Sequence, residues 1–179
     1  EYHSQEFTRR GGTLEMVQLW VNLPAKDKSA NPGYQGITNA EIPSIDLADD
    51  AGRLRVIAGE YNDHNGPART FTPMEVWDLR LNAHKGASLA PPEGQNVTVV
   101  VLDGEVAING SAPLVGPATA RLGNKGAVRL EAATSAKLLI LSGEPIDEPV
   151  AAYGPFVMNT QEEIHQAISE FQSGKFGTL

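Results

Sequence analysis

The side chains that could hold a metal ion or move a proton are few and scattered in this sequence. Glu1 and His3 are two residues apart and would share one face of a strand, a weak metal-binding pattern that a charged chain end also explains. The other histidines are interpreted as surface residues: His64 in a polar loop, His84 at a turn, and His165 on the solvent side of a helix. No two histidines have the spacing of a metal site within one element.

Other catalytic patterns find little support. The chain has no cysteine, which excludes disulfides and thiol chemistry and leaves His, Asp and Glu as metal ligands. It also lacks a G-x-S-x-G turn, a P-loop and a dinucleotide-binding glycine pattern. Glu144, Asp147 and Glu148 cluster in SGEPIDEP, where the two prolines predict a rigid acidic connector and not a catalytic site.

Composition narrows the class of protein. The chain has 179 residues, of which 41% are apolar and 20% charged, as in ordinary globular domains. A net charge of -8 argues against nucleic acid or an anionic membrane as a direct partner, because both attract basic surfaces. No apolar stretch is long enough to span a membrane, and the first residues do not resemble a signal peptide, so we expect a cytoplasmic protein.

Two segments precede the main block of predicted strands. Residues 11–23, GGTLEMVQLWVNL, alternate regularly and predict a strand with both faces at least partly covered. Residues 24–37 contain two prolines and several charges and predict a linker.

The following block predicts an all-β domain. The clearest hairpin is expected over residues 97–110, because Asp103-Gly104 between two β-rich runs suits a two-residue turn. Short strands at this spacing indicate a β-sandwich or barrel. The other predicted strands are 53–59, 75–81, 119–122, 127–132 and 136–143.

One helix is expected near the end of the chain. Thr160 and Glu163 have the spacing of a capping box, and Gly174 suits the end of the helix. The extended apolar run VAAYGPFVMNT leads into it and must lie against another surface. The apolar stripe of the helix is Ile164, Ala167, Ile168 and Phe171, and the aromatic residues predicted to be core are Trp20, Trp77, Tyr153 and Phe156.

Several stretches together resemble the pirin family over nearly the whole chain. The most specific are QLWVNLPAKDK (18–28) and YGPFVMNTQEEIHQAI (153–168). They occur in the family's order with PGYQGI (32–37), EIP (41–43), TFTPMEVWDLRL (70–81) and LSGEPIDEPV (141–150). The resemblance implies a bicupin, in which two cupin barrels of the double-stranded β-helix type face each other.

The resemblance also implies a metal site that this chain holds only in part. In the family the N-terminal cupin binds one iron or similar ion through three His and one Glu, and the C-terminal cupin usually binds none. Glu1 matches the Glu of the family's H-x-E motif, whereas His3 matches a neighbour of the ligands. Within the second barrel only His84 stands near the expected motif, so a packed structural barrel is predicted there.

The expected domains follow from the same resemblance. Residues 1–36 would be a remnant of the N-terminal cupin plus linker, 37–149 the C-terminal cupin barrel, and 150–179 a return segment and helix that pack on the N-terminal cupin. Three explanations stay open for the missing part: a piece of a longer protein, a truncated gene, or pairing with a second chain.

Three functions remain in competition. The parent protein would be an iron-dependent dioxygenase acting on a flavonol such as quercetin, and this chain alone would be inactive. Alternatively, it would be a non-catalytic regulatory cupin that binds a protein partner, which its acidic charge suits better than DNA. The third interpretation, for these residues alone, is a non-catalytic cupin domain.

Overall fold

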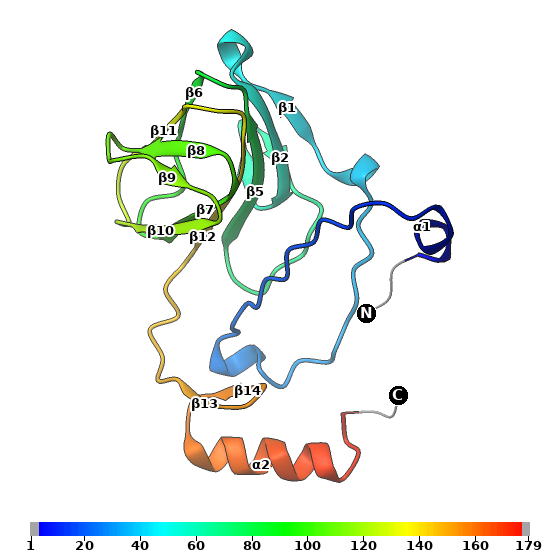
Figure 1. Cartoon of the computed structure of the whole chain (residues 1–179). Coiled ribbons are helices and arrows are strands. Elements are labelled where there is room, and N and C mark those ends of the chain that lie inside the picture. Colours follow the sequence, from blue (N-terminus) through cyan, green and yellow to red (C-terminus); the bar gives the residue numbers. More distant parts are fainter. Residues whose placement is uncertain (1–3, 177–179) are drawn as a thin grey trace.

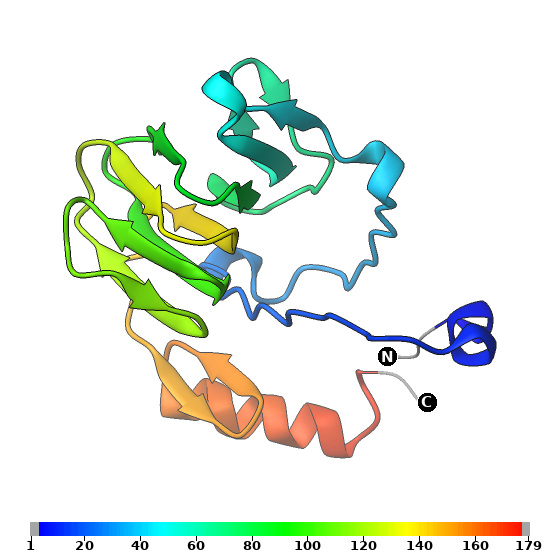
Figure 2. The ribbon, with the colours of Figure 1, turned by 45° about the horizontal axis from the view of Figure 1, so that its top comes forward.

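A computed structural model describes residues 4–176 and shows a predominantly β structure (Figures 1 and 2). Its larger sheet has six strands in the order β1-β2-β5-β12-β7-β10, and every neighbouring pair is antiparallel. The bounds are β1 Ser44–Asp46, β2 Gly52–Ala58, β5 Met74–Leu81, β12 Ala136–Gly143, β7 Asn96–Asp103 and β10 Ala118–Leu122.

The smaller sheet lies opposite and has the order β6-β11-β8-β9. Its strands are β6 Gly86–Leu89, β11 Val128–Ala132, β8 Glu105–Ile108 and β9 Leu114–Val115. In the described part of the chain no hydrogen-bonded pair joins the two sheets, so closure into the predicted barrel is not confirmed. The all-β class with one C-terminal helix is confirmed, and a short N-terminal helix adds to it.

The core lies between the two sheets and follows from strand alternation. Alternate residues of the central strands point inward, and Leu54, Val99, Leu138 and Ile140 are fully buried there. Trp77 joins this core with 1% of its surface exposed, as predicted. The predicted strands 53–59, 75–81 and 136–143 correspond to β2, β5 and β12.

The hairpin predicted over residues 97–110 is wrong. β7 pairs with β10 and β12 in the larger sheet, whereas β8 pairs with β9 and β11 in the smaller one. Gly104 forms the corner between them with φ +89°, and a Cβ there would lie 2.5 Å from the carbonyl oxygen of Ser135. The glycine therefore permits a close backbone approach where the chain changes sheets.

Residues 11–24 form no strand, although their sequence alternates. Figure 1 shows them as an extended trace between α1 (Gln5–Arg10) and the short 3-10 helix η1 (Ala25–Asp27). No described strand pairs with this segment, which explains why alternation alone did not predict it correctly. Helix α1 was not predicted, although Ser4 caps it by accepting a hydrogen bond from the Phe7 N–H.

Smaller elements surround the two sheets. Strands β3 (Glu60–Tyr61) and β4 (His64–Asn65) pair with each other. The remaining 3-10 helices are η2 (Asn39–Glu41) and η3 (Ala48–Asp50), on either side of β1. None of the helices in residues 4–176 has the length and apolar content needed to cross a membrane.

The end of the chain forms a separate layer below the larger sheet in Figure 1. A small hairpin of β13 (Ala151–Tyr153) and β14 (Phe156–Met158) packs on α2 (Gln161–Gln172). The predicted capping box is present, because the Thr160 hydroxyl accepts from the Glu163 N–H and the Glu163 carboxylate accepts from the Thr160 N–H. Ile164 and Ala167 are buried as expected, whereas Phe171 is exposed.

Candidate functional site

The predicted metal ligand Glu1 and its neighbour His3 lie outside the described residues. The other histidines occupy the surface positions expected for them: His64 on β4, His84 in a turn, and His165 on the open face of α2. Residues 4–176 contain no group of three or more His, Cys, Asp or Glu side chains that could hold a metal ion. The described donor set therefore does not fit a complete metal site.

The acidic connector has a structural role through one of its three carboxylates. Glu148 Oε2 accepts a hydrogen bond of 2.7 Å from the Ala25 N–H and one of 3.0 Å from Asn159 Nδ2. Lys28 Nζ adds a parallel contact by donating to the Val157 carbonyl at 3.1 Å. These contacts join η1 to the region of β14 and α2, in agreement with the interpretation of SGEPIDEP as a connector.

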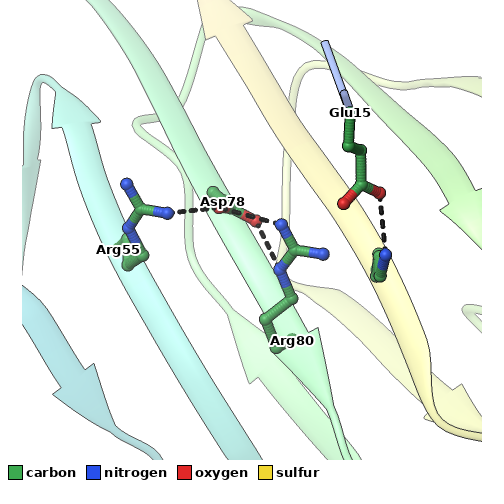
Figure 3. A network of polar contacts seen from close by, with 5 residues as sticks. Glu15, Arg55, Asp78 and Arg80 are labelled. Atoms are coloured by element: carbon green, nitrogen blue, oxygen red, sulfur yellow. Dashed lines mark hydrogen bonds and ion pairs between the residues drawn. The ribbon is translucent and has the colours of Figure 1, made fainter. Parts of the chain in front are cut away.

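An ion pair fixes the extended segment to the outer face of the larger sheet (Figure 3). Lys137 Nζ on β12 lies 2.8 Å from Glu15 Oε1, and this hydrogen bond and positive charge lower the pKa of Glu15. Beside it, buried Asp78 forms ion pairs with Arg55 and Arg80, each at 3.1 Å. The Glu15–Lys137 contact thus attaches this segment to the outer face of the larger sheet, and Val76 and Leu141 on the same face line a hollow opposite Leu19.

The apolar side chains of the flanking segments are largely uncovered. We call this set the flanking surface; its members in residues 13–23 are Leu14, Met16, Val17, Leu19, Trp20 and Val21, and its members near the C-terminal end are Val150, Tyr153, Phe171 and Phe176. Trp20 and Tyr153 are 66% and 67% exposed, so their prediction as core residues is wrong. Phe156 is half-buried and contacts Phe171 edge to face.

A hollow lies beside the first part of the flanking surface. It has a volume of about 340 Å³ and lies between residues 20–23 and the β13–β14 hairpin, whose Pro155, Val157 and Met158 line its other side. Most of its lining is apolar, with Asn22 and Lys28 as the polar members, and exposed apolar residues that gather in this way mark interaction sites. The faces of 11–23 were predicted to be at least partly covered, and within the described residues the flanking-surface side chains of this segment stay 46–66% exposed.

A second candidate site lies at the mouth of the space between the sheets. Alternation along β5 directs Glu75, Trp77, Leu79 and Leu81 inward, so an acidic residue ends an otherwise apolar row. Next to Glu75 is a cavity of about 500 Å³, which we call the mouth cavity. It is lined by Glu60, Tyr61, Asn62, Glu75, Trp77, Ser88, Ala90 and Pro92.

Glu75 is held in place by the backbone around it. Its Oε2 accepts a 2.7 Å hydrogen bond from the Glu60 N–H. A Cβ on Gly59, where φ is +76°, would collide with the Glu75 carboxylate and the Met74 carbonyl, so only glycine fits there. Burial raises the pKa of Glu75, and the Glu60 N–H and the nearby Trp77 indole oppose this in part.

The aromatic groups of the mouth cavity lie beside the Glu75 carboxylate. The Trp77 Nε1–H is buried, and its contact with Glu75 helps to lower the pKa of that carboxyl. The Tyr61 ring packs edge to face on Trp77 with centroids 5.2 Å apart. Sequence reasoning missed this site, although Glu75 shares the inward face of EVWDLRL with Trp77, and a carboxylate on an apolar strand face is a signal that could have been followed.

Comparisons with known proteins agree with the resemblance seen in the sequence. The family model described as the pirin C-terminal cupin domain matches residues 76–177. A Pseudomonas aeruginosa protein whose name marks it provisionally as a quercetin 2,3-dioxygenase is 51% identical over 178 residues, covering 98% of this chain and 62% of that protein. Mouse pirin is 36% identical over 166 residues, covering 90% of this chain and 57% of its own length.

A solved structure shows the same arrangement. The crystal structure of a quercetin 2,3-dioxygenase from Acinetobacter baumannii has a TM-score of 0.94 and 47% identity, over 98% of this chain and 62% of that one. This chain thus spans about three fifths of the length of these bacterial relatives, 62% in each case.

Proposed function

Because this chain belongs to the pirin family, we propose that it is the C-terminal part of a quercetin 2,3-dioxygenase-type bicupin that depends on a metal ion, iron in our proposal. The relatives' names support the choice of reaction, since both a P. aeruginosa and an A. baumannii relative carry the dioxygenase name. Only the names of these relatives suggest a flavonol substrate for this chain.

The observation that carries the proposal is the flanking surface. Residues 14–21 expose apolar side chains on both faces of an extended segment that is anchored to the rest of the chain at Glu15 and Ala25. A lone domain would leave this apolar area in water, which is unfavourable by about 25 cal/mol for each Å². A second cupin that supplies neighbouring strands would cover it and provide the missing hydrogen-bond partners.

We therefore propose that residues 1–36 join the N-terminal cupin, residues 37–149 form the C-terminal cupin, and residues 150–179 return to pack on the first. The occupant of the flanking surface is then the N-terminal cupin of the same protein. Its supporting argument is the additional length of the bacterial relatives, which extend well beyond the part matched here. A second chain in this place is the competing outcome.

The metal in this proposal belongs to the N-terminal cupin. Glu1 would be one ligand, and the remaining ligands would come from outside this chain, because the described donors do not fit a complete site. A mononuclear iron with open positions would supply the place where substrate oxygens and O₂ meet. The described residues contribute the scaffold that positions the first cupin, and no catalytic step is assigned to them.

The test uses the full-length protein that contains this chain, purified with its metal, alongside residues 1–179 alone. We expect the full-length protein to carry one iron by elemental analysis and to consume O₂ with quercetin, and the shorter chain to do neither. Glu1→Gln in the full-length protein should lower both metal content and rate by at least about tenfold. Glu6→Gln, on the exposed side of α1, is the matched control and should change neither.

Two results would contradict parts of this proposal. Full metal content in the Glu1→Gln protein would remove Glu1 from the ligand set. Metal binding without O₂ consumption would favour the regulatory alternative, in which the cupin acts through a protein partner. A native mass measurement on residues 1–179 distinguishes the occupants of the flanking surface, because a dimer of this chain would show that a second copy covers it.

A further inference from the structure

The mouth cavity is lined by two acidic residues, Glu60 and Glu75, which have no role in the proposed metal site. Glu75 is 7% exposed, yet no Lys or Arg lines the cavity among the described residues, and none forms an ion pair with this carboxylate. One oxygen is fixed by the Glu60 N–H, and the Trp77 indole is the other group that interacts with this carboxylate. A buried carboxylate without a positive partner is unfavourable and is best completed by a cation.

The surroundings of Glu75 restrict the kind of cation. Residues 4–176 offer no cluster of three metal-binding side chains, so a metal ion would find only the carboxylates of Glu60 and Glu75 here. Tyr61, which packs on the buried Trp77, provides aromatic surface beside these two carboxylates, an arrangement that favours organic ammonium groups. The second negative charge also opposes the binding of anions.

The Trp77 indole lies against this carboxylate and is not itself open to the cavity. Its Nε1–H is buried, and its contact with Glu75 lowers the pKa of that carboxyl, so a cation bound to Glu75 would change the surroundings of the indole. The cavity volume of about 500 Å³ falls within the range of small-molecule sites and leaves room for a larger body on the ligand.

We propose that the mouth cavity of the C-terminal cupin binds a small primary ammonium compound, with its ammonium on Glu75. Gly59 keeps the site open for this role, because any side chain there would displace the Glu75 carboxylate. The site lies between the two sheets of this chain and is independent of the metal proposed for the N-terminal cupin.

The experiment follows the indole N–H of Trp77 by ¹⁵N NMR in the full chain. Trp20→Phe removes the other of the two tryptophans, so one indole signal remains. The probe is ethanolamine, and its matched neutral control is ethylene glycol, which replaces the ammonium by a hydroxyl. We expect a saturable shift of the indole signal with ethanolamine at a Kd below about 10 mM, and at least tenfold weaker binding of ethylene glycol.

Two variants test the contact separately. Glu75→Gln keeps the shape of the side chain and should weaken ethanolamine binding at least about tenfold, because the charge partner is lost. Ser88→Leu should block the cavity from its exposed rim without touching Glu75, and it keeps the test decisive if Glu75→Gln does not fold. Glu131→Gln, exposed on β11, is the control and should bind as the parent does.

Three results would overturn the proposal. One is the lack of a saturable shift with ethanolamine up to about 10 mM. Another is an equal response in the parent, Glu75→Gln and Ser88→Leu proteins, which would place the probe elsewhere on the acidic surface. The third is a stronger response to acetate than to ethanolamine, which would reverse the sign of charge that the cavity selects.

Discussion

Two regions of the chain contain the same kind of alternating sequence, residues 44–143 and residues 13–23. In the first the alternating side chains are buried in a sheet, and in the second they are exposed. In β7, alternation places Val99 and Val101 in the core, and neighbouring strands bind the backbone on both sides. In residues 13–23, Val17 and Leu19 alternate just as regularly, yet both are exposed and their backbone has no strand partner among the described residues.

This difference shows what alternation does and does not encode. A period of two sets the direction of the side chains, but a strand also needs a neighbouring backbone to bind. In β7 that neighbour lies in the same chain. For residues 13–23 the proposed N-terminal cupin would provide it, so the two regions should respond differently to the same substitution and should become more alike in the full-length protein.

The largest expected effect comes from a matched pair of leucine truncations. Leu138→Ala in β12 removes a fully buried side chain and should lower the free energy of unfolding by about 2–5 kcal/mol. Leu19→Ala, at a residue that is 46% exposed, should change it by less than about 0.5 kcal/mol in residues 1–179. Urea denaturation followed by circular dichroism measures both.

The same two substitutions give a stricter test of the proposed cover when they are made in the full-length protein. If the N-terminal cupin covers residues 13–23, Leu19→Ala should there destabilise by about 1–3 kcal/mol, approaching a core position. An unchanged small effect in the full-length protein would contradict the proposed cover, and a large effect in residues 1–179 would show that Leu19 is already buried there.

A smaller effect is expected at the contact that joins the two flanking segments. Glu148→Ala removes the acceptor of the Ala25 N–H and of Asn159 Nδ2. We expect local opening there to become easier by about 1–2 kcal/mol, which accelerates amide exchange at Ala25 roughly tenfold. The control is Glu144→Ala, an exposed residue of the same connector, and equal exchange in both variants would argue against the role of Glu148.

Much of the sheet structure could be predicted because the residues that alternate in the sequence are also the ones that are buried in the sheet. β2, β5 and β12 carry inward apolar residues on a strict alternation, and their predicted bounds differ little from the observed ones. The capping box of α2 was equally clear, because Thr160 and Glu163 act within one turn. The sequence is enough to predict an element when its interaction partners are close in sequence, or when any apolar neighbour could cover its apolar side chains.

The errors concern partners that are distant in sequence. Asp103-Gly104 is favourable for a two-residue hairpin, but the same glycine also permits the close approach to Ser135 at a corner between sheets. Trp20 is a typical core residue by composition, and its exposure depends on what covers residues 13–23. Glu75 on the apolar face of its strand was a signal for the mouth cavity, but the rest of its lining could not be predicted, because Gly59, Glu75 and Ser88 meet only once the sheets are in place.

A weaker, pH-dependent effect is expected at Glu75, the one carboxyl within residues 4–176 whose pKa is raised by burial. Above the folded-state pKa of Glu75, the ionised carboxyl lowers the stability of the fold, and this penalty disappears as the pH falls through that pKa toward its ordinary value. Glu75→Gln should therefore stabilise at neutral pH by less than about 1 kcal/mol, because the open cavity screens the charge.

This gain should fade as the pH is lowered, since both proteins then carry a neutral side chain. Unfolding in urea at neutral and acidic pH measures the difference, with Glu131→Gln as the exposed control. A gain that grows toward acidic pH would contradict the raised pKa of Glu75. Stabilisation of the parent by ethanolamine at neutral pH, lost in Glu75→Gln, would link this measurement to the proposed ligand.

The smallest expected effect is at the ion pair between the two regions compared above. Lys137→Met removes the hydrogen bond and charge that lower the pKa of Glu15, so this pKa should rise toward its ordinary value, while Lys137→Arg should largely preserve it. Carboxyl titration by NMR checks the shift. Because Glu15 is exposed and Arg80 also lowers its pKa, the urea midpoint should hardly move. A Glu15 pKa that does not respond to Lys137→Met would show that the segment leaves β12 in solution, and the contacts of Glu148 with Ala25 and of Lys28 with Val157 would then be left to hold its C-terminal end.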